Sequence, residues 1–336
     1  MSAIYFIGAR QSDAQMTASR VGGKAANLAR LDALGLRVPP ALALDTSVSR
    51  EFMRLGHLPE SFAAHLTASL RQLEQATSLA LGGRRPLLLS VRSSPPVSMP
   101  GMLDTVIDVG LTGKTVPGLV GRTGNPWLAW DAYRRAIRSF GEVVVGVHPS
   151  AFDAIEARCL RLADVRGVDE LDPLTLRDLA RAMADLLQVR REGGLPADPF
   201  RQVIESVEAV LRSWGAPRAV AYRGLTGISD DTGTGVVIQA MVFGNAGPRS
   251  GSGVGFTRNP ATGANELYLD FAFNAQGEDV VAGRSVIEDS LLLPDLLPQV
   301  YAELQAARPR LEGEFGDMQD FEFTVEEGQL YFLQTL

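Results

Sequence analysis

Residues 320–334 of the chain are DFEFTVEEGQLYFLQ, and this stretch says most about how the chain folds. Polar and apolar side chains alternate over 320–325, so the polar members share one face of a predicted strand and the apolar members share the other. The turn residues EGQ at 327–329 separate this run from a second apolar run over 330–334. The pattern predicts an antiparallel hairpin with one polar face.

The polar face of this hairpin carries a candidate metal site. Asp320 and Glu322 project from one side of the strand with Thr324, and paired carboxylates are hard oxygen ligands suited to Mg²⁺ bound with nucleotide phosphates. A three-residue loop over 327–329 would place Gln334 opposite Glu322, whereas a loop with an even number of residues would turn Gln334 away. The alternative is the solvated polar face of an edge hairpin.

Strands are also predicted upstream of the hairpin. Apolar runs favour strands over 236–243, 253–257 and 266–273, and one helix over 297–307 interrupts the strand-rich region. The sequence GSGVG at 251–255 resembles a dinucleotide-binding fingerprint, but its spacing is wrong and no helix follows it. We expect a flexible hairpin loop there.

The middle of the chain is predicted to be helical. Large apolar residues recur at three- and four-residue spacing along one helix face, namely Trp130, Tyr133, Ile137, Phe140 and Val144. Further helices fit 150–163, 173–190 and 199–213, and the glycines and prolines of 191–199 make it the best candidate for a hinge or linker. Arg134 and Arg135 on the aromatic helix either clamp an anion or cover its polar face.

The front of the chain mixes strands, predicted over 5–7, 41–44 and 87–91, with a helix over 25–34. The order is therefore a mixed front, a helical middle and a strand-rich end. It lacks the regular strand–helix alternation of a doubly wound sheet. These features predict an α+β fold.

Composition excludes several classes of protein. The 336 residues carry a net charge of −7, which argues against a dedicated nucleic-acid binder. The single cysteine, Cys159, permits neither an internal disulfide nor a cysteine-based zinc cluster. No signal peptide is apparent, and no apolar run approaches the roughly 18 residues of a membrane span. We therefore expect a soluble, cytoplasmic protein.

Only two of the 32 basic residues are lysines, Lys24 and Lys114. Lys24 follows Gly22 and Gly23 at the start of a predicted helix, where backbone N–H groups and the helix dipole favour an anion. Lys114 lies in GKT, the end of a phosphate-loop motif, but Asp108 stands where that motif needs its first glycine. We interpret Lys24 as a candidate anion contact, with a solvated side chain as the alternative, and Lys114 as a surface residue.

A second anion-binding candidate is SVRSSPPVSMPGMLDT at 90–105. It brings the forked cation of Arg92, several hydroxyl groups and backbone amides to the end of a buried strand, and such groups bind phosphate oxygens. The alternative is an ordinary polar connection. QGED at 276–279 adds two carboxylates but by itself predicts only a turn. The three histidines have no partners at catalytic or metal-binding spacing.

Segments along the chain occur in the order typical of one known family. They are GGKAANLARLDALGLRVPPALAL, SVRSSPPVSMPGMLDTVIDVGLT, AWDAYRRAIRSFGEVVVGV, VLRSWGAPRAVAYR, VVIQAMVFGN, SGSGVGFTRNPATG, FNAQGEDVVAG and DMQDFEFTVEEGQLYFLQ. From about residue 20 onward the chain resembles the N-terminal, nucleotide-binding portion of the pyruvate phosphate dikinase family. MPGMLDT at 99–105 favours the dikinase over the related phosphoenolpyruvate synthases.

The resemblance implies an ATP-grasp fold. Its parts would be an N-terminal subdomain over 1–110 with Lys24 and the phosphate loop, a helical subdomain over 111–198 and a C-terminal subdomain over 199–336. The family binds ATP and Mg²⁺ between subdomains and acts as a phosphotransferase. It passes the terminal phosphates to a histidine on a separate swivelling domain, leaving AMP, with inorganic phosphate as co-substrate. Neither nucleic acid nor a membrane is an expected partner.

The resemblance also implies roles for particular residues. Lys24, Arg92 and Arg135 match phosphate contacts that support catalysis. The loop that closes over the phosphates would contribute Ser93, Ser94, Ser98, Gly101, Met102, Asp104 and Thr105. Cofactor contacts elsewhere would come from Gln239, Met241 and Val242 beside adenine and from Glu278 and Asp279 of the GED segment. Asp320 and Glu322 match metal and nucleotide ligands, which Gln334 supports.

Three departures from the family bear on activity. The Thr-Ser-His loop and the pyruvate-binding barrel are absent from the sequence, and the family's arginine two residues after the matching glutamine has no counterpart after Gln334, through divergence or truncation. Pro95 and Pro96 also stiffen the loop. The leading hypothesis is a module that passes phosphate to a histidine domain on another chain or on a portion absent from this sequence. The alternatives are a stand-alone kinase for a small-molecule acceptor and a nucleotide-binding regulatory protein without turnover.

Overall fold

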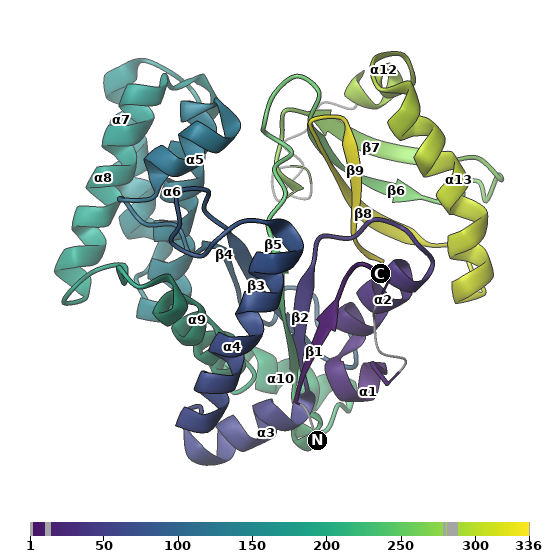
Figure 1. Cartoon of the computed structure of the whole chain (residues 1–336), viewed down its shortest axis with the longest axis horizontal. Helices are drawn as coiled ribbons and strands as arrows, with labels where there is room; N and C mark the ends of the chain where they lie inside the picture. The colour runs from purple at the N-terminus through teal and green to yellow at the C-terminus, as the bar shows by residue number, and fades with distance from the viewer. Residues whose placement is uncertain (1–2, 11–14, 278–279, 281–287, 336) are drawn as a thin grey trace. The chain divides into compact units, whose positions relative to one another are not determined.

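The computed structural model describes residues 3–10, 15–277, 280 and 288–335. These residues form two compact units that alternate along the chain. The first unit is drawn from Met1–Ile4, Ser19–Gly22 and Leu42–Met241, and the second from Tyr5–Ala18, Gly23–Ala41 and Val242–Leu336. Figure 1 labels the elements of both units.

The first sheet has five strands in the order β1-β2-β5-β3-β4. Their bounds are β1 (Ile4–Ile7), β2 (Ala41–Leu44), β3 (Leu89–Ser94), β4 (Thr105–Val109) and β5 (Gly235–Ala240). Strand β3 pairs antiparallel with β4 on one side and with β5 on the other. Every residue of β2 and β5 is buried, which explains why both strands were predictable as short continuous apolar runs.

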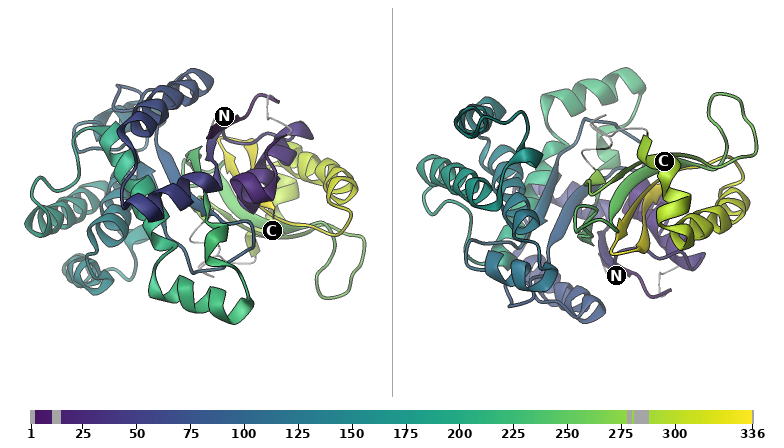
Figure 2. Two further views of the ribbon diagram at one scale, coloured as in Figure 1. Left: turned by 90° about the horizontal axis from the view of Figure 1, so that it is seen from below. Right: turned by 90° about the horizontal axis from the view of Figure 1, so that it is seen from above.

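The first unit also contains helices, some of which pack on this sheet and others on neighbouring helices. They are α3 (Thr46–Leu55), α4 (Glu60–Thr77), α5 (Val116–Thr123), α6 (Pro126–Phe140), α7 (Pro149–Ala163), α8 (Pro173–Arg190), α9 (Pro199–Ser213) and α10 (Pro217–Thr226). Helix α9 packs against β3 and β4, and α6 packs against β4, α5 and α8. Figure 2 shows the helices α5 to α8, drawn in blue-green, from two further sides.

The helices α6 to α9 begin in the same way. Each has a polar N-cap side chain that accepts a backbone hydrogen bond, followed by a proline in the first turn; the caps are Asn125, His148, Asp172 and Asp198. These local signals explain why the helices predicted over 173–190 and 199–213 are confirmed at both ends. After α6 the chain continues as a π-helix, η1 (Gly141–Val145), before Gly146 ends it with a positive φ.

The second sheet has four antiparallel strands in the order β7-β6-β8-β9. Their bounds are β6 (Gly251–Phe256), β7 (Tyr268–Phe273), β8 (Asp320–Glu326) and β9 (Gln329–Thr335). The helices of this unit are α2 (Gly23–Ala33), α12 (Glu288–Leu296) and α13 (Pro298–Phe315), and the short α1 (Ala18–Val21) lies where the chain passes between units. Helix α2 packs against β9, and α12 packs against β7 and α13.

The glycines of β6 correct one prediction. GSGVG at 251–255 is not a flexible loop but lies within β6, paired with β7 and β8. Aromatic rings lie over its glycines: a Cβ on Gly251 would be 2.2 Å from Cζ of Phe271, and a Cβ on Gly255 would be 2.4 Å from Cζ of Phe321. Glycine is needed here because neighbouring strands supply the rings, which the local sequence does not show.

The predicted α+β class is confirmed, with differences in detail. Helices α3 and α4 and strand β4 were not predicted, and α13 extends to Phe315 rather than ending near 307. The segment 191–199 lies inside the first unit, where Arg191 donates to Glu205 at 2.7 and 2.9 Å. The three-part division at 1–110, 111–198 and 199–336 stays a prediction. The two compact units are a coarser division with other boundaries and do not test it.

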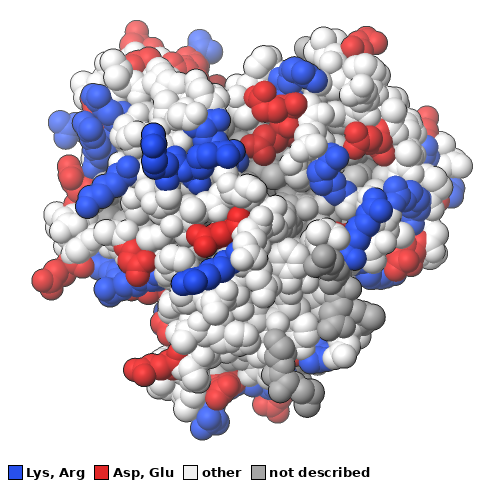
Figure 3. All heavy atoms as spheres, viewed as in Figure 1, with Lys and Arg blue, Asp and Glu red and all other residues white. Residues whose placement is uncertain are grey.

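The surface mixes charges of both signs. On the face drawn in Figure 3, Lys and Arg side chains are interspersed with Asp and Glu side chains. Within the described part of the chain, no helix combines the length and apolarity needed to cross a membrane.

Candidate functional site

One face of the first sheet gathers three of the predicted site residues. Arg92 of β3 lies opposite Thr105 of β4 and Val237 of β5, and Ser90 lies opposite Gln239. Because alternate residues of a strand share a face, Arg92, Thr105 and Gln239 belong to the same face of the sheet. Gln239 is buried and Arg92 is half-buried, so the guanidinium lies above a formed sheet rather than on a loop.

The strand carries two further predicted residues in different directions. Ser93 and Ser94 belong to β3, which extends three residues beyond the predicted end at 91. Ser93 is one residue from Arg92, so its side chain lies on the opposite face, where it is 4% exposed. The backbone N–H of Ser94 donates to Oγ1 of Thr234 at 3.2 Å. The Ser93 hydroxyl therefore lies on the face opposite Arg92, whereas Ser94, two residues from Arg92, shares the face of Arg92.

Gly22 has a packing role that its place before Lys24 did not reveal. Its φ is +83°, and a Cβ there would lie 1.5 Å from the carbonyl oxygen of Ser94. Glycine at this position permits the close approach of the two backbones. Helix α2 starts at the next residue, so Lys24 occupies its first turn, half-buried, as the sequence predicted.

The loop from 95 to 104 is anchored to α9 and α10. Met99, 5% exposed, packs in a cluster with Trp214 and Ala219, against which Met102 also packs. Arg218 donates to the carbonyl oxygen of Met102 at 3.1 Å and forms an ion pair with Asp104.

The end of this loop has a further anchor, since the N–H of Asp104 donates to Oγ of Ser213 at 3.2 Å. Ser98 and Gly101 are exposed, so they are the predicted loop residues that a ligand can reach most easily. The sequence alone did not predict that Ser213, Trp214 and Arg218 anchor this loop. Their segment was noted only as part of a resemblance, and nothing in its local pattern points to a loop more than a hundred residues earlier.

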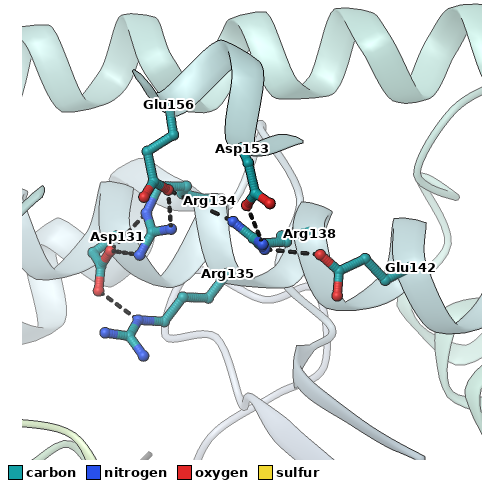
Figure 4. A network of polar contacts seen from close by, with 7 residues as sticks. All are labelled: Asp131, Arg134, Arg135, Arg138, Glu142, Asp153 and Glu156. Atoms are coloured by element: carbon teal, nitrogen blue, oxygen red, sulfur yellow. Dashed lines mark hydrogen bonds and ion pairs between the residues drawn. The ribbon is translucent and has the colours of Figure 1, made fainter. Parts of the chain in front are cut away.

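Helix α6 contains the predicted phosphate contact Arg135 in an ion-pair network (Figure 4). Asp131 accepts from Nε of Arg135 at 2.7 Å and from Nε and an amino nitrogen of Arg134 at 2.9 and 2.7 Å. Arg134 also donates to Glu156 at 3.2 Å, and Arg138 extends the network to Glu142 at 2.8 Å. The pair was expected either to clamp an anion or to cover the polar face of the helix. Arg134 does neither, because it is buried and bonded to Asp131 and Glu156.

Asp131 is ionised despite its burial. It is 0% exposed, and burial alone raises the pKa of a carboxyl group. The guanidinium groups of Arg134 and Arg135 act in the opposite sense, by charge and by hydrogen bonding, and the net result is a pKa of Asp131 below its ordinary value. The network is therefore a set of charged groups at neutral pH.

The hairpin of β8 and β9 places Gln334 as predicted, but by a different route. Glu326 pairs with Gln329, so the turn is the two-residue Glu327-Gly328, with φ of 54° and 80°, which is the even-numbered case of the two considered. A regular ladder with this turn would direct Gln334 to the other face.

An irregularity in the ladder reverses that outcome. The register shifts between Glu322 and Phe323, which leaves Leu333 as an extra residue and brings Gln334 opposite Glu322. Nε2 of Gln334 donates to Oε1 of Glu322 at 2.8 Å. The bulge therefore restores the pairing that the turn alone would have prevented.

The donors on this hairpin face suit Mg²⁺. Asp320 and Glu322 supply carboxylate oxygens from the same face of β8. Oε1 of Gln334 is buried and has no hydrogen-bond partner among the described residues, and such an atom in a native site calls for a ligand or water. No group of three or more His, Cys, Asp or Glu side chains in the described ranges could hold a metal.

The remaining predicted residues are placed as follows. The N–H of Met241 donates to the carbonyl oxygen of Leu88 at 2.8 Å. This bond continues the pairing of β3 with β5 to the last residue of the first unit. Val242 begins the next segment of the second unit and is half-buried. Glu278 and Asp279 lie outside the described residues. Gln276 just before them is buried and accepts from the N–H of Gly244 at 3.1 Å.

Several known proteins are similar in sequence to this chain. The family model described as "Pyruvate phosphate dikinase, AMP/ATP-binding domain" matches residues 54–295. The chain is 43% identical over 322 residues to "Pyruvate, phosphate dikinase, chloroplastic" of Mesembryanthemum crystallinum and 42% identical over 319 residues to "Pyruvate, phosphate dikinase 2" of Zea mays. It is 40% identical over 348 residues to "Pyruvate, phosphate dikinase" of Rhizobium meliloti (strain 1021).

These matches cover nearly all of this chain but a much smaller share of each relative. They cover 94%, 94% and 99% of this chain but 33%, 36% and 39% of the three relatives. The chain thus spans a little over a third of the length of the curated relatives that it matches. Their common region is the N-terminal part of those proteins.

Proposed function

This chain belongs to the pyruvate phosphate dikinase AMP/ATP-binding domain family, and from this premise we propose that it is a Mg-ATP-binding phosphotransferase module of ATP-grasp type. The observation that carries the proposal is the pairing of Gln334 with Glu322 across a bulged hairpin. Bulges recur beside active sites, where they re-aim a side chain, and this one brings the Gln334 amide to the carboxylate of Glu322. The buried, unpartnered Oε1 of Gln334 among the described residues favours a bound ligand there.

Residues of each unit have a separate task in this proposal. In the first unit, Arg92 and Arg135 supply guanidinium groups to the phosphates, and Ser98 and Gly101 supply exposed loop groups. In the second unit, Lys24 at the start of α2 supplies an ammonium group, and Asp320 and Glu322 hold Mg²⁺. The metal, when bound, neutralises phosphate charge. Catalysis of phosphoryl transfer depends mainly on such positioning and charge neutralisation.

The phosphoryl acceptor in the proposal is a histidine on a phosphocarrier domain outside this sequence. Loss of both terminal phosphates of ATP leaves AMP as the nucleotide product: one phosphoryl group stays on the histidine, and the other passes to inorganic phosphate, the co-substrate, to give pyrophosphate. A direct transfer to a small-molecule acceptor would instead leave ADP. The nucleotide product therefore discriminates between the two kinds of phosphotransferase.

The test incubates the purified chain with Mg-ATP and inorganic phosphate, with and without the isolated histidine domain of a dikinase relative, and quantifies AMP and ADP. AMP formed only when the histidine domain is present supports the proposal. ADP formed on addition of a metabolite supports the stand-alone kinase. Tight Mg-ATP binding without any product supports a regulatory protein, and no ATP binding at all overturns the assignment of the nucleotide site.

A further inference from the structure

Asp131 divides its carboxylate between two arginines of α6. Oδ1 accepts two hydrogen bonds from Arg134, and Oδ2 accepts from Nε of Arg135 at 2.7 Å. Arg134 is held on its other side by Glu156 at 3.2 Å. Because Asp131 is 0% exposed and fixed by Arg134, its second oxygen is a rigid acceptor for Arg135.

Arg135 is bound through Nε, the guanidinium nitrogen nearest the helix. Figure 4 shows its two terminal nitrogens pointing away from Asp131 and from the rest of the network. The guanidinium is planar, so an Nε contact also fixes the direction of the terminal N–H groups. Those groups form a fork that matches two oxygens of a phosphate.

We propose that Asp131 is a positioning residue for Arg135, holding Nε so that the terminal fork meets the phosphates of ATP. This inference rests on the proposed function, in which Arg135 contacts phosphate. Without Asp131 the long side chain would have to be ordered when the ligand binds, which weakens binding. Arg134 and Glu156 then act one step further away, by keeping Asp131 in place.

The geometry separates this role from simple charge complementarity. A lysine at 135 would keep the positive charge but has a single ammonium group in place of the fork. Asp131, a buried carboxylate that already pairs with residue 135, would bind that ammonium and draw it away from the ligand. Arg135→Lys should therefore weaken Mg-ATP binding nearly as much as Arg135→Ala, by about tenfold on the usual strength of a charge-assisted hydrogen bond.

The experiment is a double-mutant cycle on Mg-ATP affinity, measured by calorimetry on the full chain. The variants are Asp131→Asn, Arg135→Ala and the double variant. Asp131→Asn should weaken binding by about threefold to tenfold when Arg135 is present and should have no further effect in the Arg135→Ala background. Arg135→Lys provides a second measurement that does not alter the buried carboxylate, in case Asp131→Asn fails to fold.

Glu142→Gln is the matched control. Glu142 belongs to the same network through Arg138 but does not contact Asp131 or Arg135 in the described structure. It should lower thermal stability and leave Mg-ATP affinity within about twofold of the unmodified chain.

Three results would overturn the inference. The first is an equal effect of Asp131→Asn with and without Arg135, which would mean general destabilisation. The second is an unchanged affinity for Arg135→Lys. The third is an unchanged affinity for Arg135→Ala, which removes Arg135 from the phosphate contacts as well. If the unmodified chain binds Mg-ATP in these experiments, the proposed function survives the failure of the inference.

Discussion

Helix α6 and the β8–β9 hairpin present their candidate ligands by different kinds of contact. In α6, Arg135 is held by Asp131, four residues earlier on the same helix. In the hairpin, Gln334 is held by Glu322 across two strands, and only a bulge gives the pair its register. The helix contact follows from local spacing, whereas the hairpin contact depends on an irregularity in the pairing of separate strands. Two hydrogen bonds of similar length, 2.7 and 2.8 Å, therefore differ greatly in how far the sequence predicts them.

Loss of the buried carboxylate of α6 should have the largest effect. Asp131→Asn takes from the buried Arg134 the closer of its two carboxylate partners and leaves Glu156, so we expect the free energy of unfolding at pH 7 to fall by about 3 kcal/mol. Because the folded pKa of Asp131 is lowered, its stabilising contribution is complete above about pH 4 and is lost as the pH falls through the folded pKa. Urea unfolding from pH 7 to pH 3 should show the difference between unmodified chain and variant narrowing in acid. A constant difference would contradict the ionised state of Asp131.

Removal of charge from the hairpin should have the next largest effect, and on binding rather than on stability. Glu322→Gln keeps the size of the side chain but removes the negative charge that Mg²⁺ needs. We expect Mg²⁺-dependent ATP affinity to fall about tenfold to hundredfold, as measured by calorimetry over a range of Mg²⁺ concentrations. The matched control is Glu327→Gln, which changes an exposed carboxylate in the turn of the same hairpin. Equal losses in both variants would exclude a metal site on this face.

The two lysines give a prediction of intermediate size. Lys24→Ala should weaken ATP binding about tenfold, the usual contribution of one charge-assisted hydrogen bond, because Lys24 lies in the first turn of α2. Lys114→Ala should leave the affinity unchanged, since Lys114 lies on the exposed segment before α5. The affinities of both variants can be compared by titration under one set of conditions. Equal effects would contradict the role assigned to Lys24.

The anchor of the loop from 95 to 104 should give the smallest effect on stability. The Arg218–Asp104 ion pair has an arginine side chain that is 53% exposed, so Arg218→Ala should lower the free energy of unfolding by less than about 1 kcal/mol. The same change removes the contact to the carbonyl oxygen of Met102. Amide hydrogen exchange should therefore become faster over 99–105 while that of α9 stays unchanged. Unchanged exchange in the loop would show that Met99 and Trp214 anchor it without Arg218.

The predicted and unpredicted parts of the fold differ in where their signals come from. The helices over 173–190 and 199–213 were predicted well because their N-caps and prolines are local. The polar alternation of β8 was predicted for the same reason. The GSGVG strand was interpreted as a loop because its glycines make room for Phe271, Phe321 and Phe323, which are remote in sequence. Strand propensity depends on the local sequence, so it counts the glycines against a strand and takes no account of rings from other strands.

The candidate site shows the same division. The sequence was enough to predict the elements that carry the candidate charged residues, which are Lys24, Arg92, Asp320 and Glu322. The opposite orientation of Ser93 and the anchoring of Asp104 by Arg218 could not. Both depend on how β3 extends and on how α9 and α10 pack against the loop. Pairings between distant segments carry no local sequence signal.

The sequence by itself determined the α+β class, the polar face of β8 and the cationic and acidic residues that we propose as the site of a magnesium nucleotide. Periodicity and capping act over a few residues, so they are encoded locally. The tertiary structure alone decided that Leu333 bulges, that Gln334 consequently meets Glu322, and that Asp131 is buried between two arginines. Register and burial are set by the packing of the whole unit, because only packing shows which face of an element is removed from water.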